Sequence, residues 1–321
     1  MASSSSEPVV TTLPSGEAAE PSASVQQSPQ PPGQVTNKSA TVSLAAVPAR
    51  ADAFIAHLQR CLQSRAGADA VLLFLCYSFR LGGSVLETLS RPILRLSARR
   101  LVAAAFKLPP ATTVVLSATP PHPPLAALAL RLGGRFKAMA AMISETRTMG
   151  RLWGLLGLYF AAKRLVLKTC SANQESNKSE KTQDEADRLF DTLLAYAQVV
   201  SLIVFQGAEN LSYLGGKKVL PFPAATQGRL SLISVRSWGL YVGMEVSRLL
   251  IERSRRVSSG VAATDVRWMA DWRRRFLRNL AWAPLTVHWS TPNGILPDLM
   301  VSLLAAYPAT CGMLDLWRDT A

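Results

Sequence analysis

Histidine is scarce in this chain, and the residue patterns that carry most enzyme chemistry are missing. The three histidines, His57, His122 and His288, lie far apart, and none has a cysteine or carboxylate at metal-ligand spacing. The sequence contains no G-x-S-x-G motif, no P-loop and no dinucleotide-binding fingerprint. We therefore predict that the protein is not an enzyme and needs no metal or cofactor.

Cysteine and targeting signals are also scarce. The four cysteines share no spacing typical of a metal or redox motif, so we expect free thiols in a reducing compartment: Cys61, Cys76, Cys170 and Cys311. The start, MASSSSEPVV, has neither a basic stretch nor an apolar core, which predicts no secretory signal. The end, LWRDTA, does not match the peroxisomal S-K-L address, so any organelle would require an internal signal.

Acidic residues are few relative to basic ones. The chain has 35 Lys and Arg against 21 Asp and Glu, a pI near 10.2, and 49% hydrophobic residues. Nucleic-acid-binding proteins are typically basic and polar, whereas basic and apolar composition is typical of proteins bound to anionic membranes. The composition favours a membrane protein that binds anionic lipids, and we expect no nucleic-acid partner.

Aromatic residues are absent from residues 1–48, which are rich in Ser, Pro, Gln and Ala. Such a segment cannot bury enough apolar surface to order itself, so we predict a disordered tail. Residues 49–320 show helical spacing of apolar residues and no convincing alternating strand, with a Pro-rich loop at 108–124 and a polar linker at 171–186. The predicted fold is all-α, a membrane-associated helical bundle.

Apolar spacing predicts separate helices along this domain. One contains Phe54 and Leu62, and the next covers 70–81. A further helix should start close to Pro92, because proline is tolerated only in the first turn. The remaining predicted helices cover 125–167, 187–214, 229–256, 264–282 and 296–317.

No uncharged run in a predicted helix clearly reaches the roughly 20 apolar residues of a membrane-spanning helix. The segments 192–208 and 299–314 lie at or below the lower limit, and 152–162 is shorter. These segments fit either core helices of a soluble bundle or membrane-embedded helices. The basic and apolar composition favours one or two embedded helices.

Residues 90–107, SRPILRLSARRLVAAAFK, predict an amphipathic helix. A helical wheel separates basic from apolar residues imperfectly, because Leu96 and Phe106 fall on the basic side. Such a helix can insert its apolar side among acyl chains while its cations bind phosphates, although a solvated helix packed on a core would look similar. The membrane-binding candidates are Arg95, Arg99, Arg100, Lys107, Leu94 and Leu101.

Two G-x-x-x-G patterns, in GRLWG and GLYVG, place pairs of glycines on one face of a helix. Such pairs let a second helix backbone approach closely, a common arrangement in lipid, although 19 glycines make chance matches expected. Gly150 with Gly154, and Gly239 with Gly243, are candidates for helix–helix packing and for assembling copies of the chain.

The run WMADWRRRFLRNLAWAP interleaves Trp268, Trp272, Phe276 and Trp282 with arginines. Tryptophan and arginine anchor helices at the headgroup level of a membrane. Similar combinations bind single-stranded nucleic acids. We favour membrane anchoring, because the flanking segments are apolar.

The stretch GAENLSYLGGKKVL closes the most apolar predicted helix. We expect the helix to end at Leu214, with one of the next two glycines, Gly215 or Gly216, in the left-handed conformation. The lysines of this stretch would complement the negative end of the helix dipole and bind headgroups. The acid and the amide one turn earlier should turn inward or toward water. These four residues are Lys217, Lys218, Glu209 and Asn210.

This stretch resembles the peroxin-11 family of peroxisomal membrane proteins, whose members carry a similar Glu…Tyr-Leu-Gly-x-Lys run. The matching positions are Glu209, Tyr213, Leu214, Gly215 and Lys217. Two further stretches agree with the family in the same order: DAFIAHLQRCLQSRAGADAVLLFLCYSFRL and SETRTMGRLWGLLGLYFAAKRL. The resemblance covers most of residues 50–317 and is strongest to the C-type branch of filamentous fungi.

The resemblance implies a helical protein of the peroxisomal membrane that promotes elongation and proliferation before fission. It also implies a bilayer-remodelling amphipathic helix, for which 90–107 is the candidate, homo-oligomers, and recruitment of a fission adaptor and a dynamin-related GTPase. The Pro-rich insertion and the long tail depart from the compact family pattern. One alternative stays open, a metabolite pore lined by Gln198, Gln206, Glu209 and Asn210.

Overall fold

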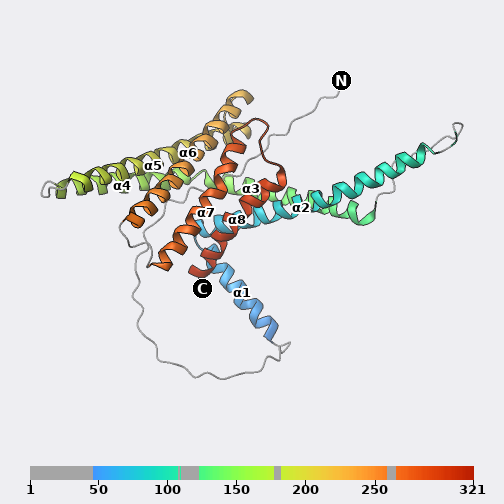
Figure 1. Ribbon diagram of the computed structural model, residues 1–321, viewed down its shortest axis with the longest axis horizontal. Coiled ribbons are helices and arrows are strands. Elements are labelled where there is room, and N and C mark those ends of the chain that lie inside the picture. The colour runs from blue at the N-terminus through green and yellow to red at the C-terminus, as the bar shows by residue number, and fades with distance from the viewer. Residues whose placement is uncertain (1–45, 108, 110–122, 177–181, 259–264) are drawn as a thin grey trace.

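The computed structural model describes residues 46–107, 109, 123–176, 182–258 and 265–321. Within these residues the chain forms eight α-helices and no strand, which confirms the predicted all-α fold (Figure 1). The helices are α1 (Ala46–Leu62), α2 (Arg65–Ala105), α3 (Pro124–Arg151), α4 (Gly154–Ser176), α5 (Thr182–Gly216), α6 (Ala224–Ser258), α7 (Val266–Trp289) and α8 (Asp298–Asp319).

Several predicted boundaries differ from the observed ones. Helix α1 begins at Ala46, inside the predicted tail, whose residues 1–45 lie outside the described part of the chain. Most of the predicted linker at 171–186 is helical, apart from 177–181, which is not described. Lys, Glu and Gln are good helix formers, so a polar segment can continue a helix. Nearly all of the predicted loop at 108–124 lies outside the described residues.

Helix α2 runs unbroken for 41 residues, where separate helices were predicted. Ser64 caps its first turn by accepting a hydrogen bond from Gly67 N. Pro92 lies inside the helix, so the expected helix start beside it was wrong. In the turn before the proline, the hydroxyls of Thr88 and Ser90 donate to carbonyls four residues earlier. The lost hydrogen bond costs about 3 kcal/mol, which the packing of so long a helix can offset.

Helices α2 and α3 form an antiparallel hairpin with a close crossing at two glycines. A Cβ on Gly83 would lie 2.9 Å from Gly133 O, so neither position has room for a side chain. Two turns away, Cys76 Sγ donates to Ala140 O at 3.4 Å. This glycine pair was not predicted, although the dipeptides in LGGS and LGGR were a visible signal.

The core lies where α2, α5, α6, α7 and α8 meet around Trp238. The Trp238 ring meets Trp282 edge-on at 5.5 Å and stacks against Trp289 at 6.0 Å. Tyr77 of α2 contacts Trp282 at 5.9 Å. Aromatic pairs of this kind add about 0.5–1.5 kcal/mol beyond their buried area. Because α2 contributes Tyr77, the hairpin and the later helices share one core.

The first residue of α8 holds the hairpin in place. Asp298 accepts hydrogen bonds from Lys137 at 2.6 Å, Ser84 at 2.8 Å and Arg80 at 3.2 Å. Ser84 also bonds to Ser302 at 3.0 Å. These groups come from α2, α3 and α8, so the cluster joins the three helices close to the glycine crossing.

Candidate membrane interface

Three helices are long and apolar enough to cross a membrane: α2, the Asp187–Gly216 part of α5, and α8. In the most apolar window of each, only 28%, 22% and 33% of the residues are buried inside the chain. In a soluble bundle, apolar helices bury most of their apolar faces against one another. The structure is therefore that of a helical membrane protein with candidate transmembrane helices.

The apolar segments expected in α5 and α8 are confirmed as candidate spans, whereas α2 was missed. Counting uncharged runs overlooked α2, because Arg80 and Glu87 interrupt it. In the structure Arg80 pairs with Asp298 at 3.2 Å and Glu87 pairs with Lys137 at 2.9 Å. Pairing lowers the free-energy cost of charges near acyl chains.

The C-terminal end of α2 projects beyond its partner helix. The antiparallel register set by the glycine crossing places Pro92 opposite the start of α3 at Pro124. We call residues 93–107 the arm. Its helical part, which ends at Ala105, extends about 20 Å at 1.5 Å per residue. Figure 1 shows this end of α2 leading away from the other labelled helices.

The arm exposes cations and apolar side chains together. Its predicted basic residues are exposed and have no ion pair within the described part of the chain: Arg95, Arg99, Arg100 and Lys107. Leu94 is half-buried and Leu101 is 38% exposed. Leu96 and Phe106 are more exposed, at 54% and 87%. Apolar side chains are therefore exposed on all sides of the arm. The side that contains Leu94, which was predicted to insert among acyl chains, is not the most exposed one.

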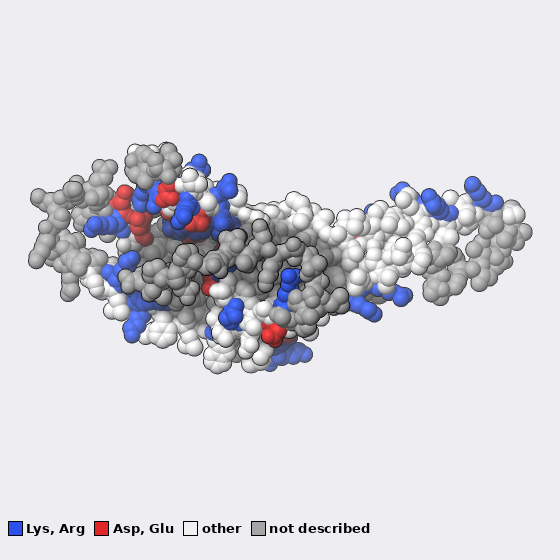
Figure 2. Space-filling model, turned by 90° about the horizontal axis from the view of Figure 1, so that it is seen from below, with Lys and Arg blue, Asp and Glu red and all other residues white. Residues whose placement is uncertain are grey.

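No acidic residue occurs between Glu87 and Glu145, a segment that contains the arm and most of α3. On the face seen in Figure 2, the arm shows Lys and Arg at its edges and no Asp or Glu. Cations without neighbouring carboxylates produce a positive potential. Apolar side chains interspersed with such cations suit a surface of anionic headgroups.

A second apolar surface, which was not predicted, runs along α3 and α4. Its exposed side chains recur at spacings of three, four or seven residues: Leu125, Leu128, Leu132, Met139, Met142, Met149, Trp153, Leu156 and Phe160. This spacing keeps the side chains of each helix on one side of that helix, and the spacing can be recognised in the sequence. An exposed apolar surface of this extent is typical of contact with a membrane or another protein.

In each of the two predicted glycine pairs, one glycine lies at a close contact between two helices of this chain. A Cβ on Gly154 would lie 2.9 Å from Gln206 Oε1, and one on Gly239 would lie 3.2 Å from Thr286 Cβ. A Cβ on Gly150 or Gly243 would have no other atom of the described residues within 4 Å, apart from its chain neighbours and its own helix backbone. One glycine of each pair therefore brings two helices of this chain together, and the other faces open space.

The acid of the family-like motif lies in a buried ion pair. Glu209 Oε1 is 2.7 Å from Arg151 Nη2. Beside it, Gln206 donates to Asn210 at 2.7 Å, and Asn210 donates to Leu152 O at 3.1 Å. Glu209 and Asn210 were predicted to turn inward or toward water, and in the structure both turn inward. Removing one member of such a pair leaves an uncompensated buried charge, so the pair must be kept whole.

A second buried arginine crosses the hairpin. Arg147 of α3 donates to both carboxylate oxygens of Asp69 on α2, at 2.9 and 3.0 Å. Gln198, proposed as a pore-lining residue, donates to Glu245 of α6 at 2.9 Å. The other proposed lining residues belong to the Glu209 cluster, so no observation favours a lumen along them.

The end of α5 differs from the prediction. The helix continues to Gly216, and the left-handed residue is Lys218, with φ of 62°. The expectation of a left-handed glycine was wrong. Gly215 has a different purpose, because a Cβ there would lie 3.2 Å from both Phe222 and Gln227. It permits close contact between the end of α5 and the start of α6.

The remaining residues of the motif connect α5 to α3. Lys217 pairs with Glu145 of α3, and its Nζ lies 5.7 Å from the centre of the Tyr213 ring. Leu214 is half-buried, and Lys218 is exposed. Lys217 therefore has a partner inside the chain, whereas Lys218 stays available to headgroups.

The tryptophan–arginine run of α7 packs inward. Trp272 and Trp282 are 4% and 5% exposed. Two arginines of α6 cover rings of this run, Arg253 at 4.8 Å from Trp272 and Arg256 at 4.3 Å from Trp268. The predicted anchoring of the buried Trp272 and Trp282 rings at headgroup level was wrong, because other helices cover them.

Comparisons with known proteins identify no relative. No family model matches the chain, and no curated protein or solved structure is significantly similar to it.

Proposed function

We propose that this protein remodels a membrane, with the arm as the inserting element and the apolar helices as the anchor. The observation that carries the proposal is the arm itself: an acid-free helix end that projects about 20 Å past its partner helix with cations and apolar side chains exposed. Nothing in the described part of the chain covers it. A bilayer surface offers both an apolar and an anionic partner.

Insertion and anchoring have different effects on a bilayer. A helix in the headgroup region expands one leaflet, and the expanded leaflet bends outward. Helices α5 and α8 would hold the body in the membrane while the arm acts on one leaflet. Several copies acting together would curve the bilayer more than one, and the open faces at Gly150 and Gly243 suit close approach of helices from other copies.

Residues 209–217 resemble a motif of the peroxin-11 family, and this resemblance supports a proposal about where in the cell the protein acts. On that basis we assign the protein to the peroxisomal membrane, in elongation and proliferation before fission, with a fission adaptor and a dynamin-related GTPase as partners. Fluorescence microscopy of the tagged full-length chain with a peroxisomal marker tests this part. Localisation to another organelle would overturn it.

The remodelling activity is tested with the full-length protein in giant vesicles that contain phosphatidylserine. Leu101→Asp combined with Phe106→Asp places two charges on exposed arm positions, where folding does not depend on them. We expect the vesicles to lose tubulation while the protein stays in the membrane. The matched control is Val257→Asp combined with Val266→Asp, at exposed positions of α6 and α7. Equal tubulation by the arm variant and the wild type would contradict the proposal.

A further inference from the structure

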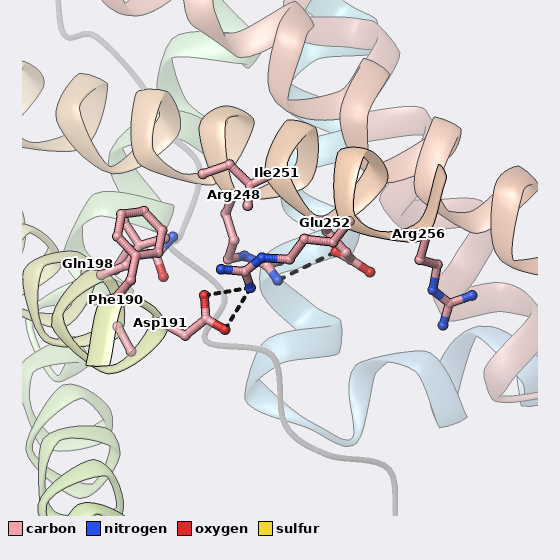
Figure 3. A pocket seen from close by; sticks show the side chains of 10 residues that line it. Phe190, Asp191, Gln198, Arg248, Ile251, Glu252 and Arg256 are labelled. Carbon is pink, nitrogen blue, oxygen red and sulfur yellow. Dashed lines mark hydrogen bonds and ion pairs between the residues drawn. The ribbon is translucent and has the colours of Figure 1, made fainter. Parts of the chain in front are cut away.

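A groove lies between the N-terminal part of α5 and the C-terminal part of α6. Its cavity measures about 350 Å³, within the range of small-molecule sites. Phe190, Leu194 and Ala195 of α5 and Ile251 of α6 give it apolar walls. Figure 3 shows Phe190 and Gln198 on α5 facing the α6 side of the groove. A groove of this size and lining accepts part of an acyl chain.

The groove lies at one end of a candidate transmembrane segment. The candidate span covers Asp187–Gly216, and its uncharged run begins after Asp191, so the groove residues of α5 lie at the N-terminal end of that run. Where α5 crosses a bilayer, this end lies at the level of the headgroups. The groove is therefore placed where a phospholipid has both its headgroup and the start of its acyl chains.

The rim of the groove carries charges of both signs. Arg248, Arg255 and Arg256 of α6 line it together with Asp191 and Glu252. Arg255 pairs with Asp191 at 3.0 Å and with Asp187 at 3.1 Å. Arg248 donates to both carboxylate oxygens of Glu245, at 2.6 and 2.9 Å, and also lies 3.8 Å from Glu252 (Figure 3). A guanidinium has five N–H donors, so an arginine that already pairs with one or two carboxylates still has N–H groups that can donate to a phosphate.

One carboxylate oxygen in this groove lacks a donor among the described residues. Glu252 Oε1 accepts from Trp268 Nε1 at 3.3 Å, but Glu252 Oε2 is buried and has no hydrogen-bond partner in the described part of the chain. The nearest guanidinium nitrogen of Arg248 is 3.8 Å from Oε2, beyond hydrogen-bond distance. Glu252 Oε1 also lies 3.9 Å from Arg275, so the carboxylate keeps a cation on that side. A buried carboxylate oxygen without a donor is unfavourable. The side chain of Glu252 is 30% exposed, so a small rotation of the carboxylate presents Oε2 to a ligand that brings an N–H group into the groove.

We propose that this groove binds a phospholipid with a primary ammonium headgroup. The phosphate would accept from the arginines of the rim, the ammonium would donate to Glu252 Oε2, and an acyl chain would lie along Phe190, Leu194 and Ile251. A phospholipid whose ammonium is fully methylated has no N–H to donate. A fatty acid or a purely anionic lipid brings no cation to the carboxylate. The proposal depends on α5 lying in a membrane and is independent of remodelling by the arm.

The test measures lipid retained by the full-length protein in detergent, by native mass spectrometry. The probes are phosphatidylethanolamine and phosphatidylcholine with identical acyl chains, which differ in the methylation of the ammonium. We expect phosphatidylethanolamine to bind about tenfold more tightly, the ratio that one charge-assisted hydrogen bond supports. Equal retention of the two lipids, or preferential retention of phosphatidylglycerol or oleate, would overturn the proposal.

Three variants locate the bound lipid. Glu252→Gln should abolish the preference for phosphatidylethanolamine and leave phosphatidylcholine binding unchanged. Leu194→Trp should fill the groove and reduce retention of both lipids. Glu145→Gln, which changes an exposed carboxylate outside the groove, should retain the wild-type preference. Circular dichroism checks that each variant keeps its helical content. A persistent preference in both groove variants would place the lipid elsewhere and refute the assignment.

The arm variant separates this proposal from membrane remodelling. Leu101→Asp combined with Phe106→Asp lies far along the chain from the groove and should retain phosphatidylethanolamine as the wild type does. Loss of tubulation with unchanged lipid preference would support both ideas independently. Loss of the preference in the arm variant would overturn the groove as the binding site.

Discussion

Arginines in two parts of the α2–α3 hairpin have opposite environments. Arg147 and Arg151 lie in the body, by which we mean the packed helices without the arm, and each is buried beside a carboxylate. Arg95 and Arg99 lie in the arm, exposed and without an ion pair in the described residues. A buried arginine needs its carboxylate, because transfer from water is strongly unfavourable. An exposed arginine keeps its hydration and remains free to bind phosphate.

Arginine therefore has two separate tasks in this protein. In the body, arginine fixes helices relative to one another, so changes there should alter stability. In the arm, arginine contributes little to folding, so changes there should alter contact with lipid. The following changes test this division.

Glu209→Gln should have the largest effect, because it leaves the Arg151 guanidinium buried without its counter-charge. Breaking a buried pair costs about 3–5 kcal/mol, and we expect the free energy of unfolding in detergent to fall by that amount. Urea titration followed by circular dichroism measures it. The control, Glu145→Gln, removes a carboxylate that is 48% exposed and should cost less than about 1 kcal/mol. Equal losses in the two variants would remove the distinction between buried and exposed pairs.

Replacing Arg95, Arg99 and Arg100 together with glutamine should weaken insertion of the arm. Each cation near an anionic surface contributes about 1 kcal/mol, so the insertion equilibrium should fall roughly 100-fold. An environment-sensitive fluorophore on Phe106→Cys, in a chain with Cys170 and Cys311 changed to serine, reports insertion in phosphatidylserine vesicles.

The stability of this triple variant should stay at the wild-type value. A matched control changes three exposed arginines of α6 and α7, Arg229, Arg236 and Arg267, and should insert normally. A fall in stability, or an equal loss of insertion in the control, would show that the arm is not the separate element described above.

Gly239→Val tests close packing in the body. The new side chain would meet Thr286, and overpacking of this kind costs about 1–3 kcal/mol. Gly243→Val enters open space and should change the free energy of unfolding by only a few tenths of a kcal/mol. Thermal unfolding of both variants in one detergent measures the difference. A larger loss at Gly243 would show that the open face is occupied.

His288 should add a small pH dependence to the body. Its Nδ1 accepts from Ile295 N and Leu296 N at 2.9 and 3.0 Å, so only the neutral ring can hold the turn before α8. Burial, together with the charge of Arg80, lowers the pKa of His288 below its usual 6.5. The stabilisation is complete above pH 6.5 and is lost as the pH falls through the lowered pKa.

We expect about 1 kcal/mol less stability at pH 5 than at pH 7.5 from this residue. His288→Asn keeps an acceptor at this position and does not titrate. The difference between the urea midpoints of wild type and variant should therefore change with pH. A constant difference would show that His288 does not hold the turn.

Apolar spacing was enough to predict an all-α fold and most helices, because one buried side per helix leaves a periodic signal. It could not show that α2 continues through Pro92, since local rules favour a break at a proline inside a helix. It also could not distinguish Arg151 from Arg99. Both are basic residues in helices, and their difference depends on Glu209, which is distant in sequence.

Other residues stand out in the sequence, but the sequence does not show what each of them contacts. The tryptophan–arginine run was predicted to anchor at the headgroup layer, but in the structure Trp272 packs against α6. The inward orientation of Glu209 followed from the cost of a carboxylate among acyl chains. The repeated apolar positions of α3 and α4 were not predicted, because charged residues interrupt them and a count of uncharged residues does not detect a pattern confined to one side of a helix.

The position of Pro92 gives the arm a mechanical property. The helix lacks one backbone hydrogen bond at Pro92, the residue where the support from α3 ends. Bending stiffness is lowest at that point, so a force on the tip turns the arm as a unit about this hinge. The Asp298 cluster holds the part of the hairpin that packs against the body, because Asp298 of α8 accepts hydrogen bonds from Ser84 of α2 and Lys137 of α3. A torque on the arm is therefore transmitted to α8.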